Sequence, residues 1–214
     1  ISSYTISGST IVFAAALTTD DSIDFITVLG DTLDLGTPSD GTVVPASMGT
    51  TAVTALTAGT GITNGTGTVY RSDVQKLGNI YHTRILIDLT GLASSGSGDI
   101  IGKAGTANSH IGQITAAING TVLSGKITCM EAPAGGDPDI NLWYADEATG
   151  AEDAAITSLT NQVQMCDSGD FAIGTVVGIP TPPAADKYLY MVTGAATNAD
   201  YTAGKLLIEL FGYV

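Results

Sequence analysis

The chain of 214 residues has few of the side chains from which catalytic and nucleic-acid-binding sites are built. It contains only seven Lys and Arg residues, two His and two Cys, and aromatic residues make up 6% of it. With 21 Asp and Glu residues, the formal net charge is -14, and it arises from a shortage of bases. Affinity for nucleic acid depends on Lys and Arg displacing the counterions of the phosphate backbone. We therefore expect no nucleic-acid partner.

Long apolar runs are missing as well. No stretch approaches the roughly 18 consecutive apolar residues of a membrane-spanning helix. The first residues, Ile1 to Ser9, are not a basic segment followed by an apolar one, as a secretory signal would be. The sequence therefore predicts neither a membrane span nor a secretory precursor. Hydrophobic residues make up 44% of the chain, which is enough for a folded core.

Glycine is abundant, with 27 residues, and Thr and Ala are frequent. Short β-prone segments alternate with turns of Gly, Asn, Asp and Pro, which is typical of an all-β fold. The clearest segments are Ile80–Leu89, Ile140–Tyr144, Phe171–Ile179, Tyr188–Thr193 and Lys205–Tyr213. Within the last two, both faces of Tyr188–Val192 and of Leu206–Phe211 are largely apolar, so we expect a covering layer on each side of these residues.

Two further patterns predict a turn and a helix. Asn119-Gly120 lies between the β-prone runs Ile111–Ile118 and Val122–Met130. Both residues of an Asn-Gly pair tolerate positive φ, so the sequence predicts a β-hairpin at this point. Ala151–Gln164 alone combines helical spacing of apolar residues with acidic residues near its start, and it predicts one short helix.

Composition divides the chain into three regions. Residues 1–44 are predicted to form a small β module from the runs Thr5–Ile6, Ile11–Leu17 and Ile23–Leu29, closed by a Gly- and Pro-containing turn. Residues 45–68 are mostly Ala, Thr and Gly, which suits either an extended linker or a segment lying along another surface, and we favour the linker.

Residues 69–214 carry the strongest strand pattern and are predicted to form a β-sandwich domain. The expected fold is thus all-β, with a small N-terminal β module followed by a jelly-roll-like β-sandwich. Strand order stays open, because jelly rolls, immunoglobulin-like sandwiches and related barrels share this alternation of short strands and turns.

Candidate catalytic and metal-binding residues are few and scattered. His82 and His110 stand alone, without the H-x-x-x-H or H-E-x-x-H spacing of a zinc site. The acidic segments Asp20–Asp24 and Gly135–Asp139 offer oxygen ligands of the kind calcium prefers, but neither matches a calcium-loop pattern, and we interpret both as solvated turns. No G-x-S-x-G elbow marks a nucleophile. We expect no enzyme, and no catalytic, cofactor-binding or metal-binding residues.

Three other features have structural interpretations. The glycines of Gly59–Gly67 precede no Lys and no strand-to-helix transition, so they do not predict a phosphate-binding loop. Trp143, the single tryptophan, is expected in the core or at a contact surface. Cys129 and Cys166 can form one disulfide if the fold brings them together, but their apolar neighbours favour two buried thiols. A carboxylate pair for glycoside cleavage stays open, because its separation is set by the fold.

Several phrases of the sequence resemble exterior proteins of tailed bacteriophages. Tyr4–Phe25, which reads YTISGSTIVFAAALTTDDSIDF, resembles the small β units of tail fibres, and Leu29–Val43 is similar to the linker that follows such units. Ile85–Leu92, Asp99–Gly102 and Tyr201–Leu210 resemble virion proteins of marine phages. The resemblance implies a non-enzymatic virion protein at the particle surface, attached through residues 1–44. It also implies a homotrimer whose partner is the major capsid protein or another virion protein.

Three functions from different classes are compatible with the sequence. We favour a capsid decoration, or cement, protein on the outer surface of the head, because no shaft repeats of a fibre are visible. A base-poor exterior suits this role, since many copies on one particle would not bind DNA or each other nonspecifically. The alternatives are a tail-fibre or receptor-binding module that contacts a cell-surface glycan or protein, and a secreted carbohydrate-active β-sandwich enzyme.

Overall fold

The computed structural model of the chain describes residues 4–7, 10–14, 16, 18, 51–53, 55–64 and 69–214. The chain divides into two compact units, Ile1–Val43 and Val44–Val214. The described part of the first unit contains an antiparallel hairpin of β1 (Tyr4–Ser7) and β2 (Thr10–Phe13). This hairpin overlaps the first two predicted runs of the N-terminal module. The third run, Ile23–Leu29, lies outside the described residues.

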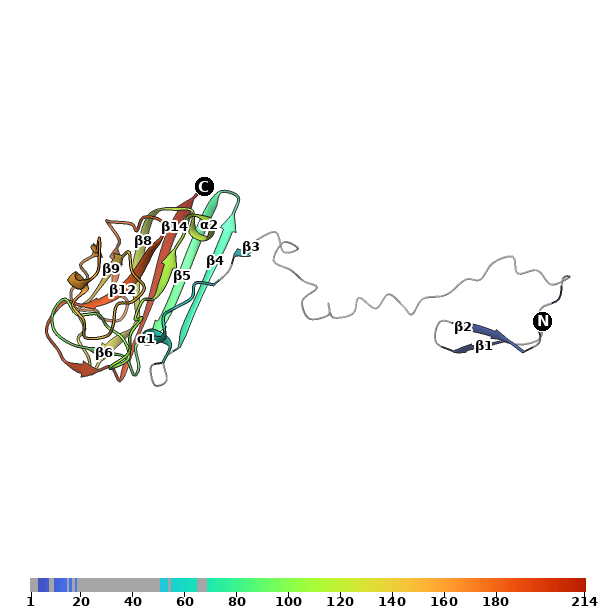
Figure 1. Ribbon diagram of the computed structural model, residues 1–214, viewed down its shortest axis with the longest axis horizontal. Coiled ribbons are helices and arrows are strands. Elements are labelled where there is room, and N and C mark those ends of the chain that lie inside the picture. The colour runs from blue at the N-terminus through green and yellow to red at the C-terminus, as the bar shows by residue number, and fades with distance from the viewer. Residues whose placement is uncertain are drawn as a thin grey trace. The chain divides into compact units, whose positions relative to one another are not determined.

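The second unit is an all-β sandwich, as the sequence predicts (Figure 1). Its six-stranded sheet has the spatial order β11 (Val176–Gly178), β8 (Thr121–Ala134), β14 (Ala203–Tyr213), β5 (Ile80–Asp88), β4 (Tyr70–Leu77) and β3 (Thr51–Val53). Its four-stranded sheet has the order β10 (Val163–Cys166), β9 (Ile140–Ala145), β12 (Lys187–Thr193) and β7 (Gly112–Ile114). A short pair joins β13 (Ala199–Asp200) to β6 (Ala93–Ser94). All of these described pairs are antiparallel.

The main core lies between the two sheets. Along β5 and β14, buried side chains alternate with half-buried ones, because successive residues of a strand point to opposite faces. The buried set joins inward residues of the six-stranded sheet to those of the four-stranded sheet, among them Ile85, Ile87, Leu206, Ile208, Leu142, Leu189 and Met191. Alternation along these strands thus decides which face of the larger sheet remains outside.

The outer side of the four-stranded sheet is covered by loops. Ile100 and Ile156 from these loops form a second buried cluster with Tyr190 and Val192 of β12. Consequently β12 is buried on both faces, which confirms the prediction for Tyr188–Val192. For β14 the prediction is wrong in the single chain, because its outward residues are half-buried or exposed and no described segment covers them.

The predicted hairpin at Asn119-Gly120 is wrong. β7 and β8, which flank this pair, belong to different sheets, and the short helix α2 (Ala116–Asn119) connects them. The Thr115 hydroxyl accepts a hydrogen bond from the amide of Ile118 at 3.3 Å and caps the helix, and Gly120 ends it at φ 65°. Positive φ is thus used to leave a helix rather than to close a hairpin.

A two-residue hairpin does occur, at Gly78-Asn79 between β4 and β5. Gly78 has φ of 59°, which glycine adopts without steric cost. The expected helix over Ala151–Gln164 is also wrong. Asp153 and Asn161 both have left-handed φ, and the segment contains only the 3-10 turn η2 (Ile156–Ser158) before β10 begins. Among the described residues, no helix is long and apolar enough to cross a membrane.

The described residues between 45 and 68, which are 51–53 and 55–64, pack with the sandwich. β3 extends the sheet beside β4, and Leu56 and Ile62 are buried in the main core. Ile62 lies in the short helix α1 (Thr60–Thr63). A Cβ atom on Gly59 would overlap the carbonyl of Asn108. At this position glycine serves close packing rather than flexibility.

Candidate functional site

The outer face of the six-stranded sheet is the candidate functional surface of the second unit. Residues that lie opposite each other in antiparallel strands project from the same face, so side chains form rows across the sheet. In one row, Asp73 of β4 lies opposite Arg84 of β5, which lies opposite Glu209 of β14, which lies opposite Lys126 of β8. We call these four residues the charge ladder.

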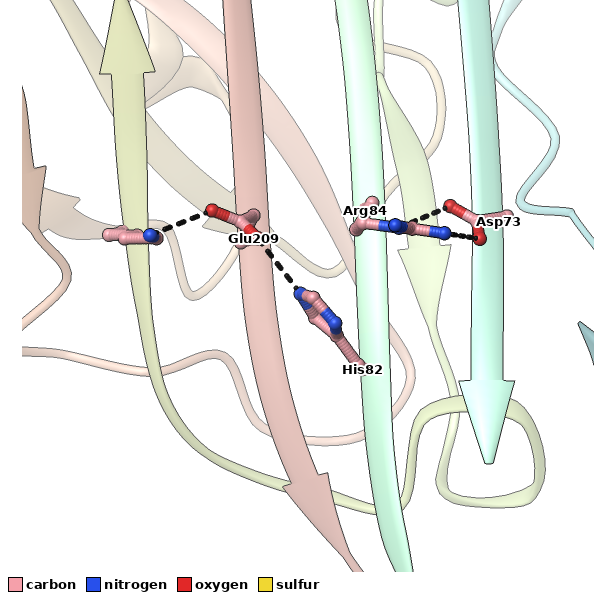
Figure 2. Close-up of polar contacts among 5 residues, drawn as sticks. Asp73, His82, Arg84 and Glu209 are labelled. Carbon is pink, nitrogen blue, oxygen red and sulfur yellow. Dashed lines mark hydrogen bonds and ion pairs between the residues drawn. The ribbon is translucent and has the colours of Figure 1, made fainter. Parts of the chain in front are cut away.

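Each charge of the ladder has an opposite charge beside it. Figure 2 shows Asp73, Arg84 and Glu209 on their neighbouring strands, together with His82. The Arg84 guanidinium donates two hydrogen bonds to the Asp73 carboxylate, one of them from Nε to Oδ1 at 2.9 Å. The Lys126 ammonium lies 3.0 Å from Glu209 Oε2, and His82 Nε2 lies 3.0 Å from Glu209 Oε1. The ladder is thus two ion pairs side by side, with a histidine attached to the second.

These pairs hold the ladder in its charged state. The hydrogen bond to Asp73 raises the pKa of Arg84. Burial works against ionisation of Glu209, but the hydrogen bonds and charges of Lys126 and His82 outweigh it and lower the pKa of Glu209. At neutral pH, therefore, the ladder presents alternating formal charges.

A second polar network lies at one end of the same face. Lys205 of β14 forms ion pairs with Glu131 of β8 and with Asp88 of β5, the latter at 3.6 Å. Asp88 also accepts hydrogen bonds from the Thr90 hydroxyl at 2.6 Å and from the Thr90 amide at 3.0 Å. Burial raises the pKa of Asp88, but these hydrogen bonds and Lys205 more than offset it, so the net pKa is lowered.

The formal charges of the outer face cancel. Its described strands carry four acidic and four basic side chains: Asp73, Asp88, Glu131 and Glu209 against Arg71, Arg84, Lys126 and Lys205. The whole chain carries -14, so the acidic excess lies entirely elsewhere. This face is therefore a neutral region of a strongly acidic protein.

Apolar side chains occupy the rows on both sides of the ladder. On one side Leu86 and Leu207 lie opposite each other and are half-buried, and they line a hollow with Arg71, Asp73, Arg84 and residues of the segment before β4. On the other side the ring of Phe211 stacks on His82, with centroids 4.7 Å apart. The last row contains three exposed side chains, Leu77 at 69%, Ile80 at 53% and Tyr213 at 53%. The outer face therefore presents apolar rows on both sides of a row of paired charges.

The two histidines singled out in the sequence lie in different parts of the sandwich. His82 belongs to the outer face just described. His110 precedes β7, and its ring contacts the edge of Tyr188 with centroids 5.0 Å apart. Its Nδ1 atom is buried without a hydrogen-bond partner, and burial lowers the pKa of His110. The structure does not bring the histidines together.

The acidic segment Gly135–Asp139 packs closely against the body rather than forming a solvated turn. Asp137 is buried, its amide donates to the Ser94 hydroxyl, and its carbonyl accepts from the Tyr201 hydroxyl at 2.7 Å. Burial, together with the charges of Asp167, Asp137 and Asp170, raises the pKa of Asp139. Among the described residues, no three His, Cys, Asp or Glu side chains are placed to hold a metal ion. The segment Asp20–Asp24 lies outside the described residues.

The two cysteines and the tryptophan pack in or against the hydrophobic clusters of the sandwich. Cys129 and Cys166 are both free thiols buried in the main core, which confirms the favoured interpretation. Burial raises the pKa of each thiol. Trp143 of β9 is partly buried against the second cluster. The described part of Gly59–Gly67 packs beside Asn108 to His110, with the amide of Gly59 donating to the carbonyl of His110 at 2.8 Å.

Sequence reasoning missed the charge ladder. Its members are scattered over four strands, and their juxtaposition depends on strand order and register, which no local pattern gives. A partial signal exists along β5. Arg84 occupies the more polar side of this alternating strand, which places it on the outer face before its neighbours are known, whereas Glu209 lies in a run whose two faces are both largely apolar.

Comparisons of the chain with protein-family models, with curated proteins and with solved structures find no match.

Proposed function

We propose that the chain is a non-enzymatic structural protein of a bacteriophage virion, most specifically a decoration protein on the outer surface of the head. The observation that carries this proposal is the broad open face of the six-stranded sheet. It combines exposed apolar side chains, which mark candidate contact surfaces when they are contiguous, with charges that are already paired within the chain. A rigid sandwich with such a face is suited to adhesion.

The resemblance to phage exterior proteins supplies the virion context. Two of the phrases that carry it, Ile85–Leu92 and Tyr201–Leu210, contain the end of β5 and most of β14, which are neighbours at the centre of the open face. The presence of a small first unit and a larger sandwich is consistent with two separate roles, attachment and contact with neighbours. In this proposal, residues 1–44 attach the chain to the major capsid protein or another virion protein, and the sandwich contacts its neighbours as part of a symmetric oligomer.

Such a protein would stabilise the shell by mass action. A ligand that binds only the folded, assembled state adds about 2.7 kcal/mol per site at a free concentration of about 100 times its dissociation constant. Many sites on one shell multiply this contribution. The function therefore requires binding and shape, without chemical transformation of a substrate.

The test compares particles with and without this chain. We expect particles that lack it to assemble but to release their genome at lower temperature and lower salt than complete particles. Adding back the purified full-length chain should restore the original release temperature. A matched control adds back serum albumin at equal concentration. Equally robust particles that fail to adsorb to cells would contradict head decoration.

That result would favour the second candidate, a tail-fibre or receptor-binding module. The division into two units is the specific observation in its favour, because a small attachment module followed by a larger tip suits this class as well. A low-resolution image of the particle with the chain labelled separates head from tail. Release of reducing ends from a glycan panel by the purified chain would instead indicate the carbohydrate-active enzyme.

A further inference from the structure

The charge ladder is complementary to itself. From β4 to β8 its signs are negative, positive, negative and positive. In the opposite direction the same row is positive, negative, positive and negative. A second copy of the row, laid over the first in reverse, therefore places an opposite charge against every charge. The complementarity follows from the order of the charges across the four strands alone.

One face-to-face arrangement of two copies uses this property. When a two-fold axis runs parallel to the strands between β5 and β14, each row lies over its own equivalent in reverse. Asp73 then faces Lys126 of the second copy, and Arg84 faces Glu209 of the second copy. When the axis instead runs along the ladder, each charge meets its own equivalent, which is repulsive. The charge order thus selects the first arrangement over the second.

The apolar rows fit the same arrangement. With the axis parallel to the strands, Leu86 lies over Leu207 of the second copy, and Ile80 lies over Tyr213. Removing these side chains from water supplies the main favourable contribution to association. Two twisted sheets also pack face to face with their strands within about 30° of each other, which keeps opposing rows in proximity near the axis.

The distribution of charge points to the same surface. Two copies of a chain with net charge -14 repel each other wherever their acidic surfaces approach. The outer face carries equal numbers of acidic and basic side chains, so approach through this face avoids that repulsion locally. We propose that two copies of this chain associate through the outer faces of their six-stranded sheets, about a two-fold axis parallel to the strands between β5 and β14.

This association is independent of the proposed role on a virion. It differs from the three-fold ring that the phage resemblance implies. In a ring, each subunit contributes two different patches, whereas a two-fold contact joins one patch to itself. The oligomeric mass and its response to ladder substitutions therefore distinguish the two.

The first test uses charge reversal and mixing of the full-length chain. Asp73→Lys and Lys126→Glu each place like charges against each other in a dimer of identical copies. Sedimentation velocity at low ionic strength should show a two-chain mass for the wild type and a dissociation constant about tenfold higher or more for each variant. In a mixture of the two variants, the new lysine faces the new glutamate, and Lys126 of the first variant faces Asp73 of the second. Mixing should therefore restore dimers.

Matched controls carry the same charge changes away from the sheet face. Asp200→Lys changes an exposed residue of β13, and Lys103→Glu changes a loop residue without a described ion pair. Both should dimerise as the wild type does, and circular dichroism should show native strand content for all four variants. A wild type that stays monomeric overturns the proposal. So does an oligomer that the ladder variants leave unchanged, or a mixture no stronger than either variant alone.

A second test needs no substitution. Within one chain, Asp73 and Lys126 are separated by three strand spacings, roughly 14 Å, so a zero-length carbodiimide cross-link between them can form only between copies. Cross-linking a mixture of isotopically labelled and unlabelled wild-type chain should give mixed-label peptides that join these two residues. If the cross-linked peptides join other pairs of residues and never this one, the arrangement is wrong.

Discussion

Replacing Asn119 by Ala should destabilise the sandwich through one buried polar contact. Asn119 and Thr83 are each only 1% exposed, and the Asn119 side-chain nitrogen donates to the Thr83 hydroxyl at 2.8 Å. The Asn119 side-chain oxygen accepts from the amide of Thr115 at 2.9 Å. Leaving a buried polar group unpaired costs about 1–3 kcal/mol, and Thr115 is half-buried, so water can replace part of its loss. We expect Asn119→Ala to lower the free energy of unfolding by about 2–4 kcal/mol.

Chemical denaturation and thermal melting measure this change. For a chain of this length, each kcal/mol shifts the melting temperature by about 2–4 °C, so the expected decrease is about 4–16 °C. Thr83→Val removes the partner hydroxyl, and in a double-mutant cycle the second change should cost about 1 kcal/mol less than it does alone. Asn198→Ala, at an exposed position, is the control and should stay within about 0.5 kcal/mol of the wild type. A wild-type melting temperature for Asn119→Ala, or strict additivity in the cycle, would refute the reasoning.

Three further predictions concern backbone strain, acid and thiols. Gly120→Ala should cost about 1–3 kcal/mol or more in denaturant titrations, because φ 65° with ψ -163° is accessible almost only to glycine and a Cβ there would crowd the carbonyl of Tyr213; a neutral effect would contradict the described backbone. The folded state lowers the pKa values of Glu209 and Asp88, so both carboxylates stabilise it above the ordinary carboxyl pKa of about 4, and this stabilisation is lost as the pH falls through the lowered values. The free energy of unfolding should therefore decrease between about pH 5 and pH 2, and it should decrease less steeply in Glu209→Gln. Equal slopes in the wild type and the variant would argue against the ladder. Cys129 and Cys166 should react with a thiol reagent only after denaturation, when two thiols are released; rapid reaction in the native state would show that they are not buried.

Strand positions in the sandwich were largely predictable because two-residue alternation is a local property. Ile80–Leu89 carries it clearly, and β5 follows that run almost residue for residue. The wrong predictions, a hairpin and a helix, arose where one local sequence pattern is compatible with two structures. Asn119-Gly120 supplies positive φ both for a hairpin and for a helix end, and only the positions of β7 and β8 in different sheets decide between them. In Ala151–Gln164, burial of Ile156 against the second cluster prevails over helical spacing.

The candidate surface was harder to predict from the sequence than the fold. Alternation assigns Arg84 to the outward side of β5, but nothing in the sequence states that β14 lies beside β5. The pairing of these two strands crosses more than a hundred residues of chain, and register errors of one residue would reverse every assignment. Surfaces assembled from distant strands are therefore visible only after the topology is known.

The close packing of Gly59 has a practical consequence for dissecting this protein. A fragment beginning at residue 69, where the composition first looks like a conventional domain, would lack Leu56 and Ile62 and would leave holes in the hydrophobic interior. The natural place to cut is between Val43 and Val44. Residues 55–64 look like a linker by composition, but they pack into the sandwich. Removing them should expose apolar core residues and make the remaining domain prone to aggregation.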